Sequence, residues 1–344
     1  ITSASAFAIL GRNFRYVTDF GYAGPVHNGT LQGNLFIQGS GDPTLGSSRY
    51  PSTGAAVVTS MIKKQLEVSG IQQVEGHLLA ALRDSTETQT IPDGWIWEDI
   101  GNYYGAGVSV LNWNENAYDL WLKPGRTEGE PVSVLRTRPA VSYHFESELL
   151  TGKKGSGDQA WLYFNPNRPG ITIRGTVPCC VDSFRISGAV PDPAEFTLSQ
   201  IAAMTGVPYS PDLKLNFPST DIKWIYSHRS PPLDSISYWF LNKSINLYGE
   251  ALIRTMGKQV KRKETTEAGT EVVMEFWEKQ GIDKNSMRIF DGSGLSPSNR
   301  LTAASLTGVL QYAFRQPWFF AFMNGFPLVN GMRMKSGTIE GVRA

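Results

Sequence analysis

The spacing of apolar side chains changes along the chain, and it predicts helices toward both ends with strands between them. Residues 1–10 are apolar or small on every side and end at Gly11, which predicts a helix buried all round. Residues 54–69 carry apolar side chains on one face only, namely Val57, Val58, Met61, Ile62 and Leu66. This pattern predicts an amphipathic surface helix.

Between residues 21 and 218 the pattern is typical of strands. Short apolar runs are separated by Gly, Pro, Asn and Asp, which are the residues that favour turns. The predicted strands cover residues 35–37, 74–82, 120–122, 132–135, 161–164 and 171–173. We therefore expect a β-rich region made of two subdomains.

Helical spacing returns after Asp221, where three helices are predicted in succession. The first has apolar side chains at Leu233, Ile236, Trp239 and Phe240. The second covers residues 247–256 and ends at Gly257, and the third covers residues 266–280.

The last part of the chain predicts a short strand, a loop and a helix. Strand 287–290 leads into Asp291, which we expect to stabilise a tight loop by accepting bonds from backbone N–H groups. Thr302 then caps a helix that should point Leu306, Val309 and Leu310 inward.

Composition limits the classes of function. Of the 344 residues, 41% are hydrophobic and 18% are charged, and the net charge is +1, as in an ordinary globular protein of about two to three domains. This balance gives no electrostatic case for a nucleic acid partner. No apolar run reaches the ~18 residues of a transmembrane segment.

Cysteine and histidine positions predict neither a metal nor a cofactor. Cys179 and Cys180 are adjacent, so their Cα atoms lie ~3.8 Å apart, closer than a relaxed disulfide prefers. We interpret them as two small, partly buried thiols near a strand end. The histidines share no spacing typical of a metal site or catalytic triad, and they are His27, His77, His144 and His228. We interpret His228 as structural.

Two short motifs carry candidate chemistry. Ser244-Ile245-Asn246 lies between two predicted helices, so its two polar side chains can act together only across a tight turn. An isolated Ser-x-Asn is more often a polar kink in a helical hairpin. Lys335-Ser336-Gly337-Thr338, about ninety residues later, changes that interpretation.

Together these motifs resemble two of the three motifs of the penicillin-recognising serine enzymes. The longer stretches 227–233, 246–254, 291–296 and 335–338, in this order, are similar to the class C low-molecular-mass penicillin-binding proteins. Residues 39–44 and 97–116 extend the resemblance to these D-Ala-D-Ala carboxypeptidase/endopeptidases over nearly the whole chain. Residues 95–116, which are dense in Trp, Tyr, Asn and Gly, are either a loop pinned by aromatic packing or a border of the active-site mouth.

The resemblance implies a fold of the α/β (α+β) class. A transpeptidase/β-lactamase-like domain would be formed by residues 1–21 plus 221–344, truncated at both ends, and interrupted by a β-rich insertion over residues 22–220. The third motif, Ser-x-x-Lys, lies in the family just upstream of a stretch like residues 1–10. Its only internal match, Ser60 to Lys63, falls on the predicted surface helix and is interpreted as chance. We therefore expect the chain as given to lack its nucleophile and to be inactive.

The resemblance also assigns roles to the two motifs. Ser244 would relay a proton between the missing lysine and the leaving amine, and Asn246 would hold the peptide amide. Lys335 would attract the substrate carboxylate, which Ser336 would bind. Gly337 would allow close approach of the backbone, and the Thr338 N–H would form part of the oxyanion hole.

The function implied is that of a serine D,D-peptidase acting on peptidoglycan stem peptides through an acyl-enzyme. β-Lactam antibiotics such as penicillins would be further ligands. Such a protein would be periplasmic or exported and associated with the cell wall. The alternative is a non-catalytic cell-wall-binding protein of the same fold. A β-lactamase is disfavoured because the long insertion matches the peptidases.

Overall fold

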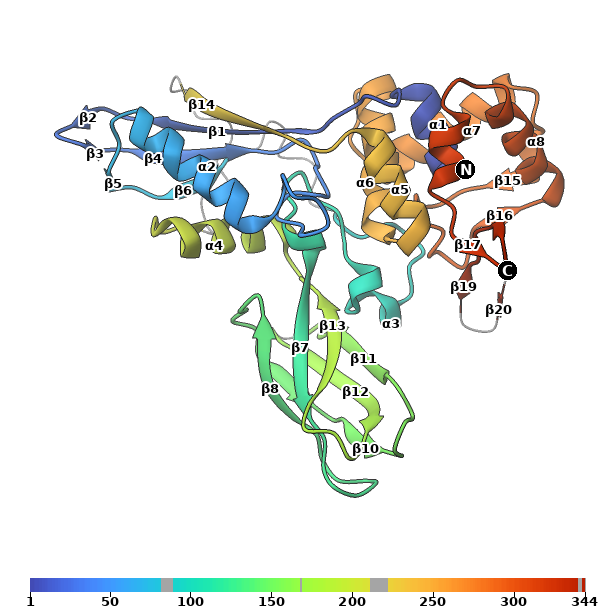
Figure 1. Ribbon diagram of the computed structural model, residues 1–344, viewed down its shortest axis with the longest axis horizontal. Coiled ribbons are helices and arrows are strands. Elements are labelled where there is room, and N and C mark those ends of the chain that lie inside the picture. Colours follow the sequence, from blue (N-terminus) through green and yellow to red (C-terminus); the bar gives the residue numbers. More distant parts are fainter. Residues whose placement is uncertain (82–88, 168, 211–221, 340–341, 344) are drawn as a thin grey trace. The chain divides into compact units, whose positions relative to one another are not determined.

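The computed structural model describes residues 1–344 except 82–88, 168, 211–221, 340–341 and 344 (Figure 1). Its contacts divide the chain into two compact units. The main unit contains Ile1–Gly94, Val108–Glu115 and Asp192–Ala344, and the β unit contains Trp95–Gly107 and Asn116–Pro191. The chain therefore leaves the main unit and returns to it twice.

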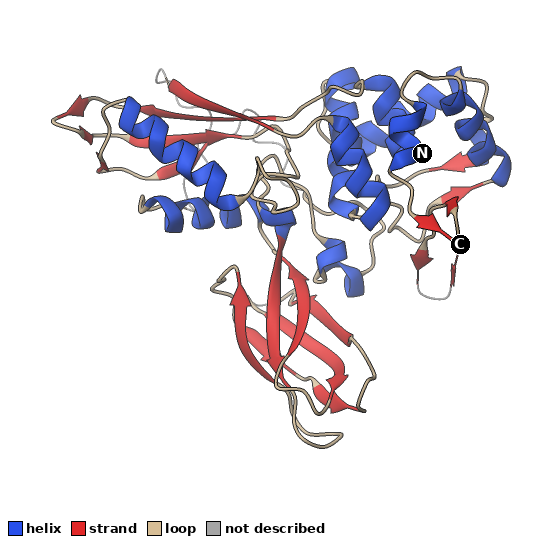
Figure 2. Ribbon diagram, viewed as in Figure 1, coloured by secondary structure: helices blue, strands red, loops and turns tan. Residues whose placement is uncertain are grey.

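Helices form one part of the main unit (Figure 2). They are α1 (Thr2–Ile9), α5 (Leu233–Lys243), α6 (Asn246–Lys261), α7 (Thr266–Lys279), α8 (Ala303–Phe314) and α9 (Phe319–Asn324). Helix α1 contacts α5, α6, α7 and α9, and its residues from Thr2 to Phe7 are all buried. The helix predicted at the start of the chain, buried all round, is confirmed.

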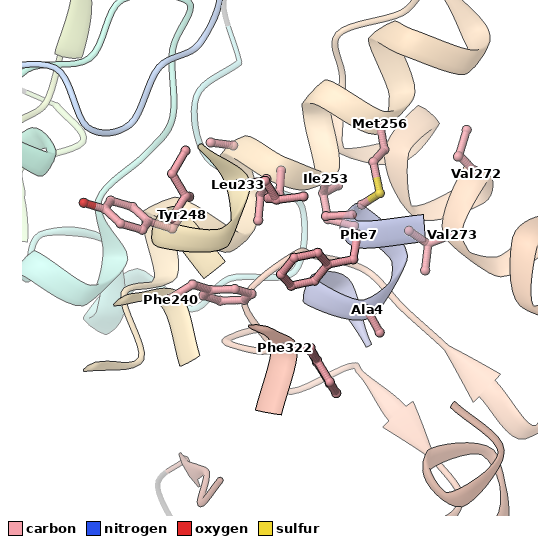
Figure 3. Close-up of a cluster of buried hydrophobic side chains, with 14 of the residues drawn as sticks. Ala4, Phe7, Leu233, Phe240, Tyr248, Ile253, Met256, Val272, Val273 and Phe322 are labelled. Carbon is pink, nitrogen blue, oxygen red and sulfur yellow. The ribbon is translucent and has the colours of Figure 1, made fainter. Parts of the chain in front are cut away.

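The core of this helical part forms around α1 and α6 (Figure 3). Phe7 stacks on Trp318 with ring centroids 5.3 Å apart and meets the edge of Phe322. Polar groups on the buried surface of α1 are paired, as burial requires. The indole N–H of Trp277 donates to the Ser5 hydroxyl over 2.8 Å.

Two predicted details of the helices are wrong. Helix α6 does not end at Gly257 but continues to Lys261, and Gly257 instead lies where α7 approaches. A Cβ atom at this position would come within 2.8 Å of the Gly269 nitrogen, so glycine serves close packing here. In α8, Val309 is buried, but Leu306 and Leu310 are exposed, because the helix buries the narrower face that also carries Ser305 and Ala313.

The second part of the main unit is a four-stranded sheet. Its order is β14 (Lys223–Arg229), β1 (Val17–Ala23), β4 (Asn34–Gln38) and β6 (Leu78–Ala80). Helices α2 (Ala55–Val68) and α4 (Pro193–Thr205) contact it through β14 and β6 respectively (Figure 1). The amphipathic helix predicted over residues 54–69 is confirmed, and it buries Val58, Ile62 and Leu66.

Small sheets complete the main unit. One has the order β2 (Val26–His27), β3 (Thr30–Leu31), β5 (Gln73–Val74). The others pair β15 (Met287–Arg288) with β16 (Arg300–Leu301), β17 (Leu328–Val329) with β18 (Met332–Arg333), and β19 (Thr338–Ile339) with β20 (Val342–Arg343). Over its described residues, the predicted strand 74–82 is two strands, β5 and β6, and residue 82 lies outside the described part of the chain. The predicted strand 287–290 is shorter, since β15 ends at Arg288.

The β unit contains two sheets (Figure 2). One has the order β13 (Phe184–Ala189), β7 (Ala117–Lys123), β8 (Ser133–Arg138). The other joins β10 (Leu150–Gly152), β12 (Ile171–Pro178) and β11 (Gln159–Phe164), with β9 (Phe145–Ser147) pairing β12. Buried side chains alternate with half-buried ones along β7, as expected for a strand with one face in the core. The short helix α3 (Trp97–Ile100) and the 3-10 helix Tyr103–Gly105 belong to the same unit.

The strands predicted over residues 35–37, 120–122, 132–135, 161–164 and 171–173 are confirmed as β4, β7, β8, β11 and β12. The two compact units have other bounds than the predicted domains, 1–21 plus 221–344 and 22–220, and one sheet contains β1 and β14 as well as β4 and β6. The division into domains stays a prediction. Within the part of the chain that the structure describes, no helix has the length and apolar character needed to span a membrane.

Candidate active site

Ser244 and Asn246 meet at the junction of α5 and α6. Ser244 ends α5 in the left-handed conformation (φ 54°, ψ 49°), Ile245 is extended, and Asn246 is the first residue of α6. Only a few per cent of residues other than glycine adopt a positive φ, at a cost of about 1–2 kcal/mol. The tight turn that the sequence required between the two helices is thus present, and it leaves Ser244 exposed and Asn246 half-buried.

The Lys335-Ser336-Gly337-Thr338 motif lies in a different element. Residues 334–337 connect β18 to β19, and Thr338 begins β19. The Lys335 side chain is exposed over much of its surface, but its ammonium donates to the Ser336 carbonyl oxygen. Partial desolvation of this ammonium lowers the pKa of Lys335. A Cβ atom at Gly337 would meet no protein atom within 4 Å, so the space beside its backbone is open.

The internal Ser-x-x-Lys match has the character of a surface helix. Ser60 and Lys63 are both exposed on α2, and the Ser60 hydroxyl donates to the Val57 carbonyl oxygen of the preceding turn over 2.8 Å. The Ser60 hydroxyl therefore bonds its own helix instead of a neighbouring base. These contacts support the interpretation of the match as chance.

The loop after β15 is organised by Asp291, as predicted. Its carboxylate accepts bonds from the backbone N–H groups of Gly294 (2.8 Å) and Ser296 (2.5 Å) and from the Asn299 side-chain amide (2.9 Å). The Asp291 carboxylate is nearly fully buried, so these bonds replace the water that it would otherwise bind. The loop therefore has a fixed shape beside α1, where Thr2 donates to the Gly292 carbonyl oxygen over 2.6 Å.

A second carboxyl group at this loop was missed by the sequence analysis. Glu250 lies one turn after Asn246 on α6 and is fully buried. It accepts bonds from the backbone N–H groups of Gly292 (2.9 Å) and Ser293 (2.7 Å). Burial, and secondly the charge of Asp291, raise the pKa of Glu250 to about 8, against the bonds from Ser293 and Gly292 that favour the carboxylate.

A further cluster links α6 to the segment Val108–Glu115. The Tyr248 hydroxyl, two residues after Asn246, donates to the Glu115 carboxylate over 2.9 Å. The same carboxylate oxygen accepts from Ser47 (2.8 Å) and from Arg49 (2.6 Å). Residues 108–115 are therefore anchored to the helix that begins at Asn246, whereas residues 95–107 belong to the β unit. That residues 95–116 border the active-site mouth stays a prediction.

The histidine near the motifs and the possible metal ligands were the remaining candidates. His228 is buried, its Nδ1 lies 3.1 Å from the Tyr226 hydroxyl oxygen, and burial lowers its pKa. Over residues 1–81, 89–167, 169–210, 222–339 and 342–343, no group of three or more His, Cys, Asp and Glu side chains is arranged to hold a metal ion. The site as described is an exposed, strained Ser-x-Asn turn, with a buried carboxyl group one helical turn below it.

Comparisons with known proteins identify the family to which the sequence is similar. The sequence model of the D-Ala-D-Ala carboxypeptidase 3 (S13) family matches residues 1–343. The chain is 26% identical over 379 residues to the D-alanyl-D-alanine carboxypeptidase of Actinomadura sp. (strain R39), covering 100% of this chain and 68% of that protein. It is 24% identical over 349 residues to the D-alanyl-D-alanine carboxypeptidase DacB of Haemophilus influenzae, covering 99% of this chain and 69% of that protein.

The fold is also found among solved structures. The crystal structure of penicillin binding protein 4 (dacB) from Haemophilus influenzae superposes with a TM-score of 0.78 and 21% sequence identity. The superposition covers 99% of this chain and 78% of that one. It confirms the predicted mixed α/β fold of the penicillin-binding proteins. This chain therefore spans about two thirds of the first two curated relatives and somewhat more of the solved structure.

Proposed function

The chain belongs to the D-Ala-D-Ala carboxypeptidase 3 (S13) family, and from that membership we propose that it is a serine D,D-peptidase of peptidoglycan stem peptides. Cleavage would pass through an acyl-enzyme, and penicillins and other β-lactam antibiotics would acylate the same serine. The names of the relatives support this proposal, since they include D-alanyl-D-alanine carboxypeptidases and a penicillin binding protein.

The observation that carries the proposal is the conformation of Ser244. A serine has no intrinsic reason to adopt the left-handed conformation, and residues held in sparsely populated backbone conformations cluster at functional sites. Here the turn exposes the hydroxyl of Ser244 while Asn246 starts the next helix. If the turn were only a polar kink between two helices, glycine or asparagine would adopt the left-handed conformation at a lower cost in free energy.

Each residue of the turn then has a chemical task. Ser244 would pass a proton between a basic lysine and the leaving amine, because a hydroxyl both donates and accepts. Asn246 would bind the amide of the scissile peptide with its side-chain oxygen and nitrogen. The position of Asn246 is fixed by the buried part of α6, in which Glu250 and Tyr248 bond to two neighbouring segments.

The C-terminal motif would bind the substrate carboxylate. Lys335 offers a positive charge with a partly desolvated ammonium, and Coulomb attraction to a carboxylate is stronger where water is excluded. The Ser336 hydroxyl would donate to the same carboxylate, and the open space at Gly337 would admit the ligand backbone. The Thr338 N–H would stabilise the oxyanion of the tetrahedral intermediate.

In this proposal the nucleophile is not among the residues assigned above. A serine hydroxyl needs a positioned base, and the resemblance gives that task to a lysine one helical turn after it. Ser60 and Lys63 do not fit, because both are exposed on α2. We infer that this chain itself lacks the catalytic serine and its lysine. We also place the protein outside the cytoplasm, in association with the cell wall, because its proposed substrate is there.

The test uses the longest natural form of the protein, labelled with a fluorescent penicillin and assayed for release of D-Ala from a stem peptide. Ser244→Ala should slow both reactions by at least ~100-fold, the lower range for a lost acid–base group. The matched control is Ser60→Ala, which should leave both rates unchanged. If the natural protein bound peptidoglycan but neither released D-Ala nor was labelled, the non-catalytic alternative would replace this proposal.

A further inference from the structure

Two thiols in the β unit lie in contact on an exposed loop. Cys179 and Cys180 follow strand β12, in the connection to β13 (Figure 1). Cys179 is half-buried and Cys180 is exposed, and both are free thiols. Their Sγ atoms are 2.7 Å apart, closer than the ~3.5–4.0 Å at which nonbonded carbon atoms pack, although sulfur is the larger atom.

The backbone brings these two side chains together. Successive side chains of an extended chain point to opposite faces, which would separate the two sulfur atoms. Cys180 instead has a φ of 66°, a conformation that is uncommon for any residue except glycine. The Cys179 N–H donates to the Gly152 carbonyl oxygen of β10 over 3.1 Å, which fixes the first cysteine to the sheet. The contact is therefore built by the fold.

We propose that Cys179 and Cys180 form a thiol–disulfide exchange site that closes reversibly into a cyclic disulfide between neighbouring residues. The co-reactant is a disulfide, R–S–S–R. The Cys180 thiolate attacks one of its sulfur atoms, which forms a mixed disulfide and expels one RS⁻. The Cys179 thiolate then attacks the Cys180 sulfur and expels the second RS⁻. The pair loses two electrons and two protons, and the co-reactant is reduced to two thiols.

The surroundings of the two thiols set the order of attack. Cys180 is reachable from solvent, whereas Cys179 is half-buried. The hydrogen bond with Cys180, followed by partial desolvation, raises the pKa of the Cys179 thiol, against a smaller opposing effect of Lys154. Since the thiolate is the attacking species, Cys180 reacts first and Cys179 closes the ring.

The ring would be labile rather than a structural cross-link. Neighbouring Cα atoms lie ~3.8 Å apart, below the ~4.4–6.8 Å typical of disulfides, and such a mismatch makes the bond easier to reduce. Strained, exposed disulfides belong to the exchanging class. The geometry thus points to a site that exchanges with soluble thiols and disulfides, independently of the proposed peptidase activity.

The test exposes the reduced chain to oxidised glutathione, traps the remaining thiols with an alkylating reagent and measures the intact mass. The natural chain should lose two hydrogen atoms, retain no glutathione and regain both thiols with dithiothreitol. Cys179→Ser should stop at one retained glutathione on Cys180. Cys180→Ser should react at least several-fold more slowly, because only the half-buried thiol is left. Stable glutathione adducts on the natural chain, or faster reaction of Cys180→Ser, would overturn the proposal.

A second arm asks whether the fold builds the site. Ring closure of the native chain should be at least tenfold faster than that of the same chain unfolded in urea, because only the native backbone holds the two sulfur atoms in contact. Equal rates in the two states would show that the reaction belongs to any adjacent cysteine pair, and the assignment of a built site would be wrong. Peptidase assays play no part in either arm, so failure here leaves the proposed function untouched.

Discussion

We expect the buried carboxyl group of Glu250 to make the stability of the main unit depend on pH. Its pKa is about 8 in the folded chain, against an ordinary value of 4.5. Between these values the folded state holds a proton that the unfolded state has lost. The free energy of unfolding should therefore fall as pH rises from about 4.5 to about 8, by roughly 5 kcal/mol in total.

The substitution Glu250→Gln tests this expectation, because a neutral amide keeps an oxygen for the N–H groups of Gly292 and Ser293. Urea unfolding at pH 5, 6.5 and 8 should show a flatter dependence in the variant, with its largest relative gain at pH 8. Glu278→Gln, on the exposed side of α7, is the matched control and should follow the natural chain. An unchanged slope in Glu250→Gln would contradict the assignment.

Lys335 provides a second prediction for a single residue, which rests on the proposed function. In the longest natural form of the protein, Lys335→Ala removes the positive charge offered to the substrate carboxylate. Loss of a charge-assisted hydrogen bond costs about 1.5–3 kcal/mol, so penicillin acylation and peptide cleavage should both fall roughly 10- to 150-fold.

Lys335→Arg is the matched variant, since it keeps the charge but replaces the compact ammonium with a planar group, and partial recovery is expected. The measurement is the second-order rate of labelling by a fluorescent penicillin. Acylation of Lys335→Ala within twofold of the natural protein, together with loss of activity in Asn246→Ala, would remove Lys335 from the site.

Sequence reasoning found Asp291 but not Glu250, for a physical reason. Asp291 bonds residues three and five positions later, so the stretch Asp291-Gly-Ser-Gly-Leu-Ser296 contains both partners. Glu250 bonds N–H groups 42 and 43 residues away, and a charged side chain within a helix is normally assigned to its exposed face. A signal was present, because Glu250 lies between Leu247 and Ile253 on the side that is buried.

At the scale of elements, the contact between α6 and α7 depends on a glycine in each helix. A Cβ atom at Gly269 would lie 2.1 Å from the Ile253 carbonyl oxygen, and a backbone atom cannot move away cheaply. Gly269→Ala should therefore lower the free energy of unfolding by about 2–3 kcal/mol, although alanine favours the helix by about 1 kcal/mol.

Gly308→Ala in α8 is the control, because there the nearest atom is the flexible end of Ile282 at 3.2 Å. This substitution should be neutral or slightly stabilising, since the gain in helix propensity remains. Both variants are measured by denaturant unfolding of the same chain. If Gly269→Ala were as stable as Gly308→Ala, the close approach of α6 and α7 would not be a constraint.

The elements that the sequence predicted correctly are those whose signal is local in the chain. Helices with a regular apolar stripe, such as α2 and α7, were found because their signal is local. The end of α6 was misplaced because Gly257, which usually marks a helix end, here makes room for Gly269. Strands β1 and β14 were missed because they pair over some 200 residues, and polar residues such as Thr18 and His228 break their apolar runs.

At the scale of the whole molecule, the β unit is joined to the rest of the chain at closely spaced ends. The Val190 N–H donates to the Asn116 carbonyl oxygen over 2.9 Å, so the segment between them leaves and returns at one place. Within this segment the two sheets have their own core, which includes Leu120, Leu162 and Ile173. The contacts that fold it are therefore mostly internal.

We expect the main unit to remain folded when residues 117–189 are replaced by a short Gly-Ser linker. The ends already lie within hydrogen-bond distance, and closing a short loop costs little entropy. The contact between Glu115 and Tyr248 lies within the main unit and should persist. Residues 95–107 should lose protection, because Asn102 no longer has the Leu162 N–H to accept from. Hydrogen exchange should show that α6 and α7 are protected as in the full chain. Thermal unfolding should show a single cooperative transition within a few degrees of the original one. Uniform loss of protection in α6 and α7 would mean that the two units fold as one.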